Sequence, residues 1–365
     1  MLKNLTRRLA LASLMLPSLL WPALPVHAQA AAAPLKVGFV YVTPIGQAGW
    51  TYQHEQGRLA LQRELGDRVR TSVVEGVPEG ADAERVMRDL ASQGHRLVFA
   101  TSFGYLEPAL RVAADFPQVV FEQAGGYKTA PNVNTYNARF YEGRYLAGYI
   151  AGRTSRSGIA GYVAGFPVPE VVQGINAFAL GMRAANPKAQ VRVLWLDTWF
   201  DPPRERDAAL SLIRGGADVL ANHSGSPAVP QAAEEQGVKA FGYQSDMSRF
   251  APNAQLAAIT ADWGGYYVRV ARSVLDGTWK ARPVWGGMKD GMVHLAALHP
   301  SLPKPLVAEV EARRRDIVAG TLQPFSGRLV DSQGRVRLDS GALDDAAIAS
   351  MDWFVEGVSG SLPPR

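Results

Sequence analysis

Large aromatic side chains stand directly after several apolar runs of this sequence. They share one position, at or just past the end of a predicted strand: Trp50, Phe103, Phe166, Trp199 and Trp263. A nucleobase-like ring that stacks on such a side chain gains about 1–3 kcal/mol per face. Sugars also bind on aromatic faces, so the pattern by itself predicts a flat or sugar-like neutral ligand.

Polar residues that could orient such a ligand occupy the same kind of position. Asn222, Asp246 and Asp262 each follow a predicted strand. A carboxylate such as Asp246 can accept hydrogen bonds from ring N–H groups or from an exocyclic amine. Trp50 ends a glycine-rich loop at the start of a predicted helix. There it could lie on a ligand, or it could pack the helix onto the sheet.

The sequence lacks the common motifs of catalysis. It contains no G-x-S-x-G, H-E-x-x-H or P-loop pattern, and it has no cysteine for a thiolate nucleophile or a disulfide. His223 near Ser224 and Ser226 could imitate a hydrolase pair, but the segment reads equally well as a polar loop. No two histidines are spaced i, i+4, as a two-histidine metal site on one helix requires. We therefore expect a protein that is not an enzyme and that uses no metal or cofactor.

The positive charge of the chain is concentrated at its start. The 365 residues hold 38 basic and 33 acidic side chains, a formal net charge of +5. Residues 1–30 combine Lys3, Arg7 and Arg8 with a long apolar run that ends in Ala28-Gln29-Ala30, the pattern of a secretory signal peptide. Without these three basic residues, 35 basic side chains face 33 acidic ones. This near balance argues against nucleic acid as a partner.

The elements that must position the aromatic residues alternate along the chain. The predicted strands span 36–43, 69–75, 96–101 and 119–123, then 158–163, 191–196, 219–221, 239–243 and 256–260, with amphipathic stretches between them. This alternation predicts an α/β protein with two doubly wound parallel-sheet lobes. Ligands of parallel sheets bind beyond the carboxyl ends of the strands. A helix over 306–320 and a hairpin over 325–339 are predicted to follow.

Short segments in order along most of the chain, from about residue 35 to 320, resemble the basic membrane protein (BMP) family, the PnrA-like substrate-binding proteins of ABC transporters. The segments that carry the resemblance include KVGFVY at 36–41, GWTYQHEQG at 49–57, VFATSFGY at 98–105, YNARFYEGRYLAG at 136–148, IAGYVAGFPVPEVVQGINAF at 159–178, GADVLANHSGS at 216–226 and GYQSDMSRFAP at 242–252. The resemblance implies a type I periplasmic-binding-protein fold with two lobes joined by a three-stranded hinge. The expected lobes are 35–134 plus 258–288 and 135–257 plus 289–365.

The resemblance also implies a function and site residues. It implies capture of a purine nucleoside for import, with an ABC permease as partner and the base stacked between aromatic side chains of the two lobes. Trp50 stands where the family has a phenylalanine, and Trp199 or Phe200 stands where it has the second-lobe aromatic residue. Asp246 stands in the element that hydrogen-bonds the base in the family.

Three departures from the family bear on the ligand. The aspartate that holds ribose hydroxyls after the fourth strand is replaced within Gln123–Gly126. The aspartate of the first loop is replaced within Gly46–Gly49, and the lysine after the strand near 260 is replaced within Ala261–Trp263. Loss of the ribose-binding carboxylates leaves the base stack intact. We therefore predict a free purine base, adenine first, in preference to a nucleoside.

Two alternatives remain open at the level of the sequence. One is a binding protein of the same fold for another small ligand such as a sugar. The other is a secreted hydrolase that acts on a nucleoside. The family's lipid-anchoring cysteine is absent, so we expect a protein that is free in the periplasm. We also expect it to be a monomer.

Overall fold

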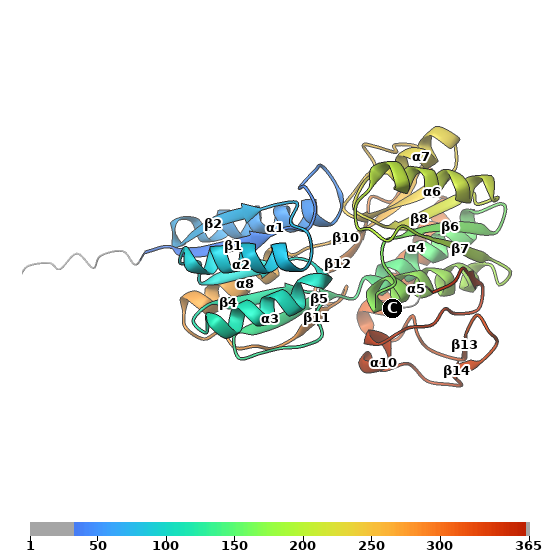
Figure 1. Ribbon diagram of the computed structural model, residues 1–365. Helices are drawn as coiled ribbons and strands as arrows, with labels where there is room; N and C mark the ends of the chain where they lie inside the picture. The colour runs from blue at the N-terminus through green and yellow to red at the C-terminus, as the bar shows by residue number, and fades with distance from the viewer. Residues whose placement is uncertain (1–32, 363–365) are drawn as a thin grey trace, which may run out of the picture. The chain divides into compact units, whose positions relative to one another are not determined.

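The computed structural model describes residues 33–362, and the described residues from Pro34 onward form one compact unit built on two large sheets (Figure 1). The predicted signal peptide at 1–30 lies outside the described residues. Within the described range, no helix combines the length and the apolar character that crossing a membrane requires.

The first sheet contains six parallel strands in the order β11-β5-β4-β3-β1-β2. Their bounds are β1 Leu35–Val40, β2 Val69–Val74, β3 Leu97–Ala100, β4 Val120–Ala124, β5 Val133–Ala138 and β11 Val284–Gly286. The helices of this lobe are α1 Gly49–Leu65, α2 Ala81–Ser92, α3 Leu106–Asp115 and α8 Gly264–Leu275.

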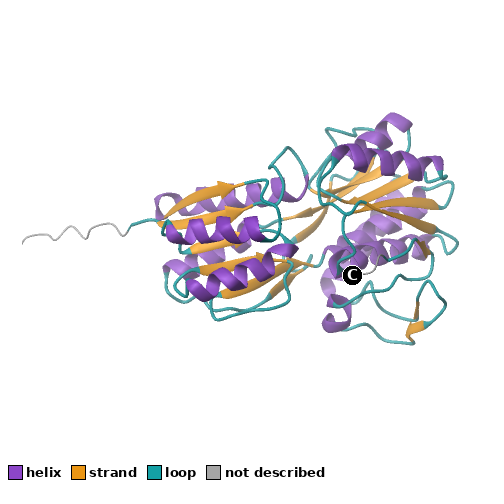
Figure 2. Cartoon of the chain, in the orientation of Figure 1, coloured by secondary structure: helices purple, strands orange, loops and turns teal. Residues whose placement is uncertain are grey.

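The strands of the first sheet are apolar on both faces because helices cover both. Successive side chains of a strand point to opposite faces. Phe39 of β1 accordingly joins the core cluster that contains Leu61 of α1, whereas Val40 joins the cluster that contains Val86 of α2. Figure 2 shows this layering, with helices on either side of the strands.

The second sheet contains seven strands in the order β12-β10-β9-β8-β6-β7-β15, of which β12 runs antiparallel to β10. Their bounds are β6 Ile159–Ala164, β7 Gln190–Trp195, β8 Val219–His223, β9 Lys239–Gln244, β10 Gln255–Ala261, β12 Val293–Ala296 and β15 Val358–Ser359. The helices of this lobe are α4 Phe140–Thr154, α5 Pro169–Ala185, α6 Pro202–Arg214, α7 Ala228–Gln236, α9 Lys304–Ala319 and α10 Asp345–Ala349.

Helices α4 and α5 pack with their backbones in close approach. A Cβ atom on Gly148 would lie 2.0 Å from the carbonyl oxygen of Phe178, and one on Gly181 would lie 1.9 Å from that of Tyr145. Only glycine permits this spacing. This close packing against α4 therefore fixes the position of α5, including its N-terminus.

The C-terminal segment completes the second lobe. It forms the short hairpin β13 Leu329–Val330 and β14 Val336–Leu338, then α10, and then β15, which adds to the edge of β7. Buried side chains of α5 depend on it: Asn176 donates to the carbonyl of Trp353 at 2.7 Å and accepts from the amide of Val355 at 3.0 Å. This segment therefore satisfies polar groups that the rest of the lobe leaves buried.

The predicted α/β class with two parallel-sheet lobes is confirmed, and each predicted strand has a counterpart. The prediction omits the short strands β11, β12 and β15, and it omits β5, whose polar sequence VNTYNA does not look buried. Its Asn134 lies in the protein interior because the carboxylate of Glu122 accepts its Nδ2 hydrogen at 3.1 Å. The expected lobe bounds remain a prediction, and the strand pairing adds that β10 continues the second sheet as far as Ala261.

Candidate functional site

A cavity lies at the carboxyl ends of strands from both sheets. Residues from the first sheet's side of the cavity are Val42, Thr43, Trp50, Ser102, Phe103, Ala124 and Gly125. Residues from the second sheet's side are Val168, Glu170, Trp199, His223, Ser224, Gly225, Tyr243 and Gln244. This position is the one that parallel sheets use for ligands.

Direct contacts join the two walls of the cavity. The amide of Gly49 donates to the hydroxyl of Ser245 at 2.9 Å. The guanidinium of Arg249 donates to the carbonyl oxygen of Gln47 at 3.0 Å. These bonds connect the loop before α1 to the loop after β9, so the structure has the two lobes closed on one another.

Trp50 is held by hydrogen bonding and by aromatic packing. Its indole Nε1 donates to the carbonyl oxygen of Thr101 at 2.7 Å. Its ring meets His54 edge-on at 4.3 Å between centroids, and His54 stacks on Trp263 at 4.9 Å. Burial lowers the pKa of His54 well below its usual range, so this ring is neutral at pH 7. Trp263 is itself buried and supports Trp50 from behind.

Trp199 approaches from the second lobe. Its ring meets Phe166 edge-on at 4.9 Å, and Gly165 leaves room for it, since a Cβ there would lie 2.7 Å from the indole. Its Nε1 donates to the carboxylate of Glu79 in the first lobe at 3.3 Å. Glu79 also accepts the amide hydrogen of Gly104 at 3.0 Å. The indole is therefore fixed by groups from both lobes.

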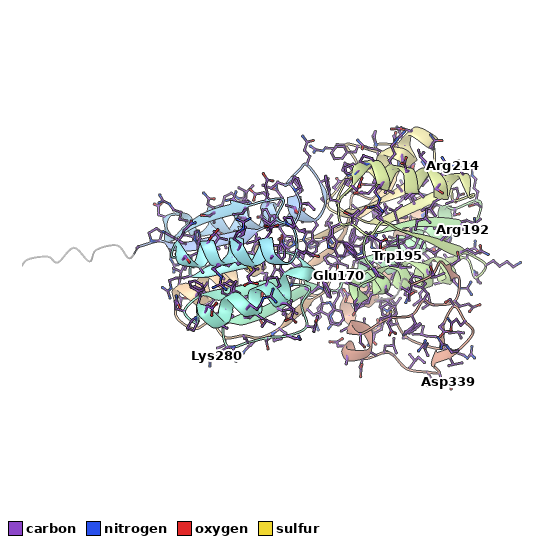
Figure 3. The ribbon with its side chains drawn as sticks, in the orientation of Figure 1. Glu170, Arg192, Trp195, Arg214, Lys280 and Asp339 are labelled. Carbon is purple, nitrogen blue, oxygen red and sulfur yellow. The ribbon has the colours of Figure 1, made fainter. Side chains whose placement is uncertain are left out.

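A polar group of three side chains lies at the second lobe's side of the cavity. Glu170, the second residue of α5 and labelled in Figure 3, lies 3.4 Å from Nε2 of His223. The hydroxyl of Tyr243 lies 3.3 Å from the same nitrogen. Burial lowers the pKa of His223, against an opposing effect of Glu170. The other oxygen of Glu170 accepts from Nδ2 of Asn137 at 2.8 Å.

The buried guanidinium of Arg144 packs against Tyr243 of this polar group. The guanidinium of Arg144 lies 3.6 Å from the ring centroid of Tyr243, in a cation–π arrangement. It also donates to the carbonyl oxygen of Asn222 at 2.5 Å. Arg144 is fully buried, so its charge contributes to the electrostatic environment of the cavity wall.

Of the eight residues predicted from the sequence, Trp50, Phe103 and Trp199 line the cavity together. Phe166 packs on Trp199, in the wider cleft next to it. Trp263 lies behind Trp50, in the core of the first lobe.

The three predicted polar residues are not part of the cavity lining, and each has a partner nearby in the sequence. Asp246 is exposed and accepts from the amide of Ser248 at 2.9 Å. Asp262 is exposed and accepts from the amide of Gly264 at 2.9 Å, at the start of α8. Asn222 is buried, and its Nδ2 lies 3.3 Å from the carbonyl oxygen of Ser224.

The sequence prediction missed Glu170, Tyr243 and Gln244 as residues of the lining. For Gln244 a signal was available, because it is the last residue of its strand and immediately precedes Ser245-Asp246. For Glu170 the local sequence gives only a helix start, and its place at the cavity depends on how α5 packs.

The serines near His223 do not pair with that histidine as a nucleophile would. Ser224 and Ser226 donate to the buried carboxylate of Glu205 at 2.8 and 2.7 Å. Burial raises the pKa of Glu205, and the two serines counteract part of that effect. The described residues contain no cluster of three or more acidic or histidine side chains arranged to hold a metal ion.

Comparison with known proteins places these features in a family. The pattern of the family described as ABC transporter substrate-binding protein PnrA-like matches residues 35–325. A purine-binding protein of Brucella abortus is 50% identical over 332 residues, which cover 90% of this chain and 94% of that protein. A putative ABC transporter glucose-binding protein of Haloferax volcanii is 38% identical over 329 residues, which cover 90% of this chain and 81% of that protein.

Solved structures agree on the fold. An ABC transporter solute-binding protein from Aeropyrum pernix aligns with a TM-score of 0.70 at 18% identity, over 80% of this chain and 93% of that one. A solute-binding protein from Conexibacter woesei aligns with a TM-score of 0.65 at 23% identity, over 79% of this chain and 98% of that one. The expected two-lobed fold of periplasmic solute-binding proteins is thereby confirmed.

Proposed function

Since the chain belongs to the PnrA-like family of ABC transporter substrate-binding proteins, we propose that it captures a free purine base, adenine in preference to a nucleoside, and passes it to an ABC permease. The purine class is supported by the half-identical relative that is named as a purine-binding protein. The choice of the base over the nucleoside is supported by the composition of the cavity.

The observation that carries this proposal is the set of side chains around the cavity. Trp50, Phe103 and Trp199 supply flat apolar surface from both lobes. Among the lining residues Glu170 is the one carboxylate, and Asn137 and His223 already lie against its oxygens. A ribose would bring several hydroxyl groups that need partners when buried, whereas a base needs mainly stacking and a few polar contacts.

Binding and closure are coupled in this proposal. A ligand can stabilise the closed state only by contacts that it makes better there than in the open state. Trp50 from one lobe and Trp199 from the other can provide such contacts, since both line the cavity while the lobes are in contact. The bonds from Gly49 to Ser245 and from Arg249 to Gln47 then hold the closed form.

Calorimetry on the protein purified without added ligand tests the proposal. We expect adenine to bind more tightly than adenosine and glucose. A nucleoside that binds more tightly than adenine would refute the preference for the base, and an absence of purine binding would refute the purine class.

A second candidate is a sugar, because the relative from Haloferax volcanii is named as a putative glucose-binding protein. Aromatic faces and a carboxylate such as Glu170 also suit a sugar ring. The same calorimetric series decides between them, since glucose would then bind and adenine would not.

We place the mature protein in the periplasm as a monomer. This is supported by the family, whose members serve ABC transporters, and by the signal-peptide pattern at 1–30. N-terminal sequencing of the exported protein should begin near residue 31, and light scattering should give the mass of one chain. A retained N-terminus or a dimer mass would contradict this placement.

A further inference from the structure

Gln244 has a buried side-chain amide that pairs with no group between residues 33 and 362. It is the last residue of β9, only 1% of its surface is exposed, and it lines the cavity. Neither its Nε2 nor its Oε1 has a hydrogen-bond partner within the described residues. Buried amides are nearly always paired, because burial without a partner costs stability. Both polar atoms of the amide are therefore available to form hydrogen bonds with a ligand in the cavity.

The backbone at Gln244 is also unusual. Its φ is +64°, in the left-handed region that favours glycine. The position is held on both sides: Gln244 is in register with Thr260 of β10, and Ser245 accepts from the amide of Gly49 in the other lobe. Strained residues of this kind persist where the surroundings impose them, and they concentrate at ligand sites. Glycine would relieve the strain, so the presence of glutamine indicates that its side chain has a use.

A second buried glutamine nearby shows the ordinary arrangement. Gln255, at the start of β10, is 1% exposed like Gln244. Its Oε1 accepts from the amide of Met247 at 2.9 Å, and its Nε2 donates to Asp246 at 2.7 Å. Both ends of this amide are paired within the protein. The side-chain amide of Gln255 thus has the protein partners that the amide of Gln244 lacks among the described residues.

We propose that Gln244 recognises the ring edge of the ligand through a paired donor and acceptor. This inference rests on the proposed purine function and assigns the recognition of the substituent at position 6 of the purine to one residue. A primary amide offers an N–H donor beside a carbonyl acceptor. Adenine offers the complementary pair, its exocyclic amine beside a ring nitrogen, and glutamine forms such bidentate pairs with adenine. The lactam edge of hypoxanthine or guanine is complementary to the same amide after rotation by half a turn.

The proposal predicts discrimination against unsubstituted purine. That molecule stacks like adenine but has no donor at position 6, so one atom of the Gln244 amide would remain unpaired. Sites built to pair with a polar substituent reject the analogue that lacks it. A good bidentate pair corresponds to about tenfold discrimination or more. We therefore expect the wild-type protein to bind adenine about tenfold more tightly than purine.

Calorimetry with adenine and unsubstituted purine tests the proposal on the mature protein and two variants. Gln244→Met keeps the length of the side chain and removes both polar atoms. We expect it to bind the two ligands with equal affinity, through the stack alone. Gln255→Met is the matched control, which we expect to lower Tm but to preserve the preference for adenine.

The outcomes separate this inference from the proposed function. Wild-type protein that binds adenine and purine equally overturns the role of Gln244 and leaves purine capture intact. A preference that survives in Gln244→Met overturns it as well. Wild-type protein that binds no purine overturns the proposed function and this inference together. If Gln244→Met does not fold, equal affinities of the wild-type protein for adenine and purine would still overturn the proposal.

Discussion

Replacement of Gly49 by alanine should weaken ligand binding by preventing full closure. A Cβ at this position would lie 2.3 Å from the carbonyl oxygen of Gly225 in the other lobe, whereas ordinary contact begins near 3.4 Å. The two loops would therefore have to separate by about 1 Å. That movement breaks the bond from the Gly49 amide to Ser245 and loosens the packing beside it.

The size of the effect follows from these contacts. A lost hydrogen bond costs about 0.5–1.5 kcal/mol, and the loss of neighbouring contacts raises the total to about 1.5–3 kcal/mol. This corresponds to a Kd about 10-fold to 150-fold higher. The positive φ of Gly49, +88°, adds a cost of about 1 kcal/mol to the stability of the protein, but that cost is common to the open and closed forms.

Gly46→Ala is the matched control for this prediction. Gly46 also has a positive φ, +58°, but a Cβ there would meet only the carbonyl oxygen of Pro44, at 3.9 Å. We expect both variants to lose similar thermal stability and only Gly49→Ala to lose affinity for adenine, measured by calorimetry. Small-angle scattering should show that adenine compacts the Gly46 variant more than the Gly49 variant. Equal affinities of the two variants would refute the closure argument.

Three further predictions address the stack, the pH dependence and the predicted aspartate. Trp50→Ala should raise the Kd for adenine about 5-fold to 150-fold, since it removes one stacked face worth about 1–3 kcal/mol; unchanged calorimetry would remove the stacking role. Because burial lowers the pKa of His54 below that of an unfolded histidine, near 6.5, the unfolded chain takes up its proton first on acidification and stability falls below that pH. His54→Gln removes the one proton that the unfolded chain takes up at this position, so Tm should fall less steeply with decreasing pH between about pH 7.5 and 5.5. An unchanged slope of Tm against pH would contradict this prediction. Asp262→Ala should lower the free energy of unfolding by about 1 kcal/mol in denaturant titrations, since it removes the hydrogen bond from the amide of Gly264. The Kd for adenine should not change. A large loss of affinity would show that Asp262 contributes to the ligand site.

Much of the fold could be predicted because its signals are local. Apolar β-rich runs separated by amphipathic stretches occur wherever a parallel sheet is covered on both faces, as around Phe39 and Val40. β5 was not predicted because its polar residues are buried against partners that belong to other strands and helices. Asn134, for example, bonds to Glu122, and Tyr266 donates to the same carboxylate at 2.5 Å.

The site could be predicted in part for a related reason. Trp50 and Trp199 lie in the segments that follow the carboxyl ends of β1 and β7, so the order of elements places them near the ligand cavity. The same rule also selected Asp246 and Asp262, whose carboxylates bond to backbone amides two residues further along. Sequence position does not separate such a local bond from ligand contact. Gln244 differs from these aspartates because its side-chain amide has no hydrogen-bond partner in the part of the chain that the structure describes, a fact that only the three-dimensional structure reveals.

The C-terminal segment has a consequence for how the chain reaches its native state. Residues 353 and 355 satisfy Asn176, and β15 covers the outer edge of β7. An uncovered strand edge is a template for pairing between chains. The second lobe thus cannot complete its fold until the last residues emerge from synthesis or translocation, and a chain shortened at residue 325 should aggregate even though it contains the whole ligand cavity.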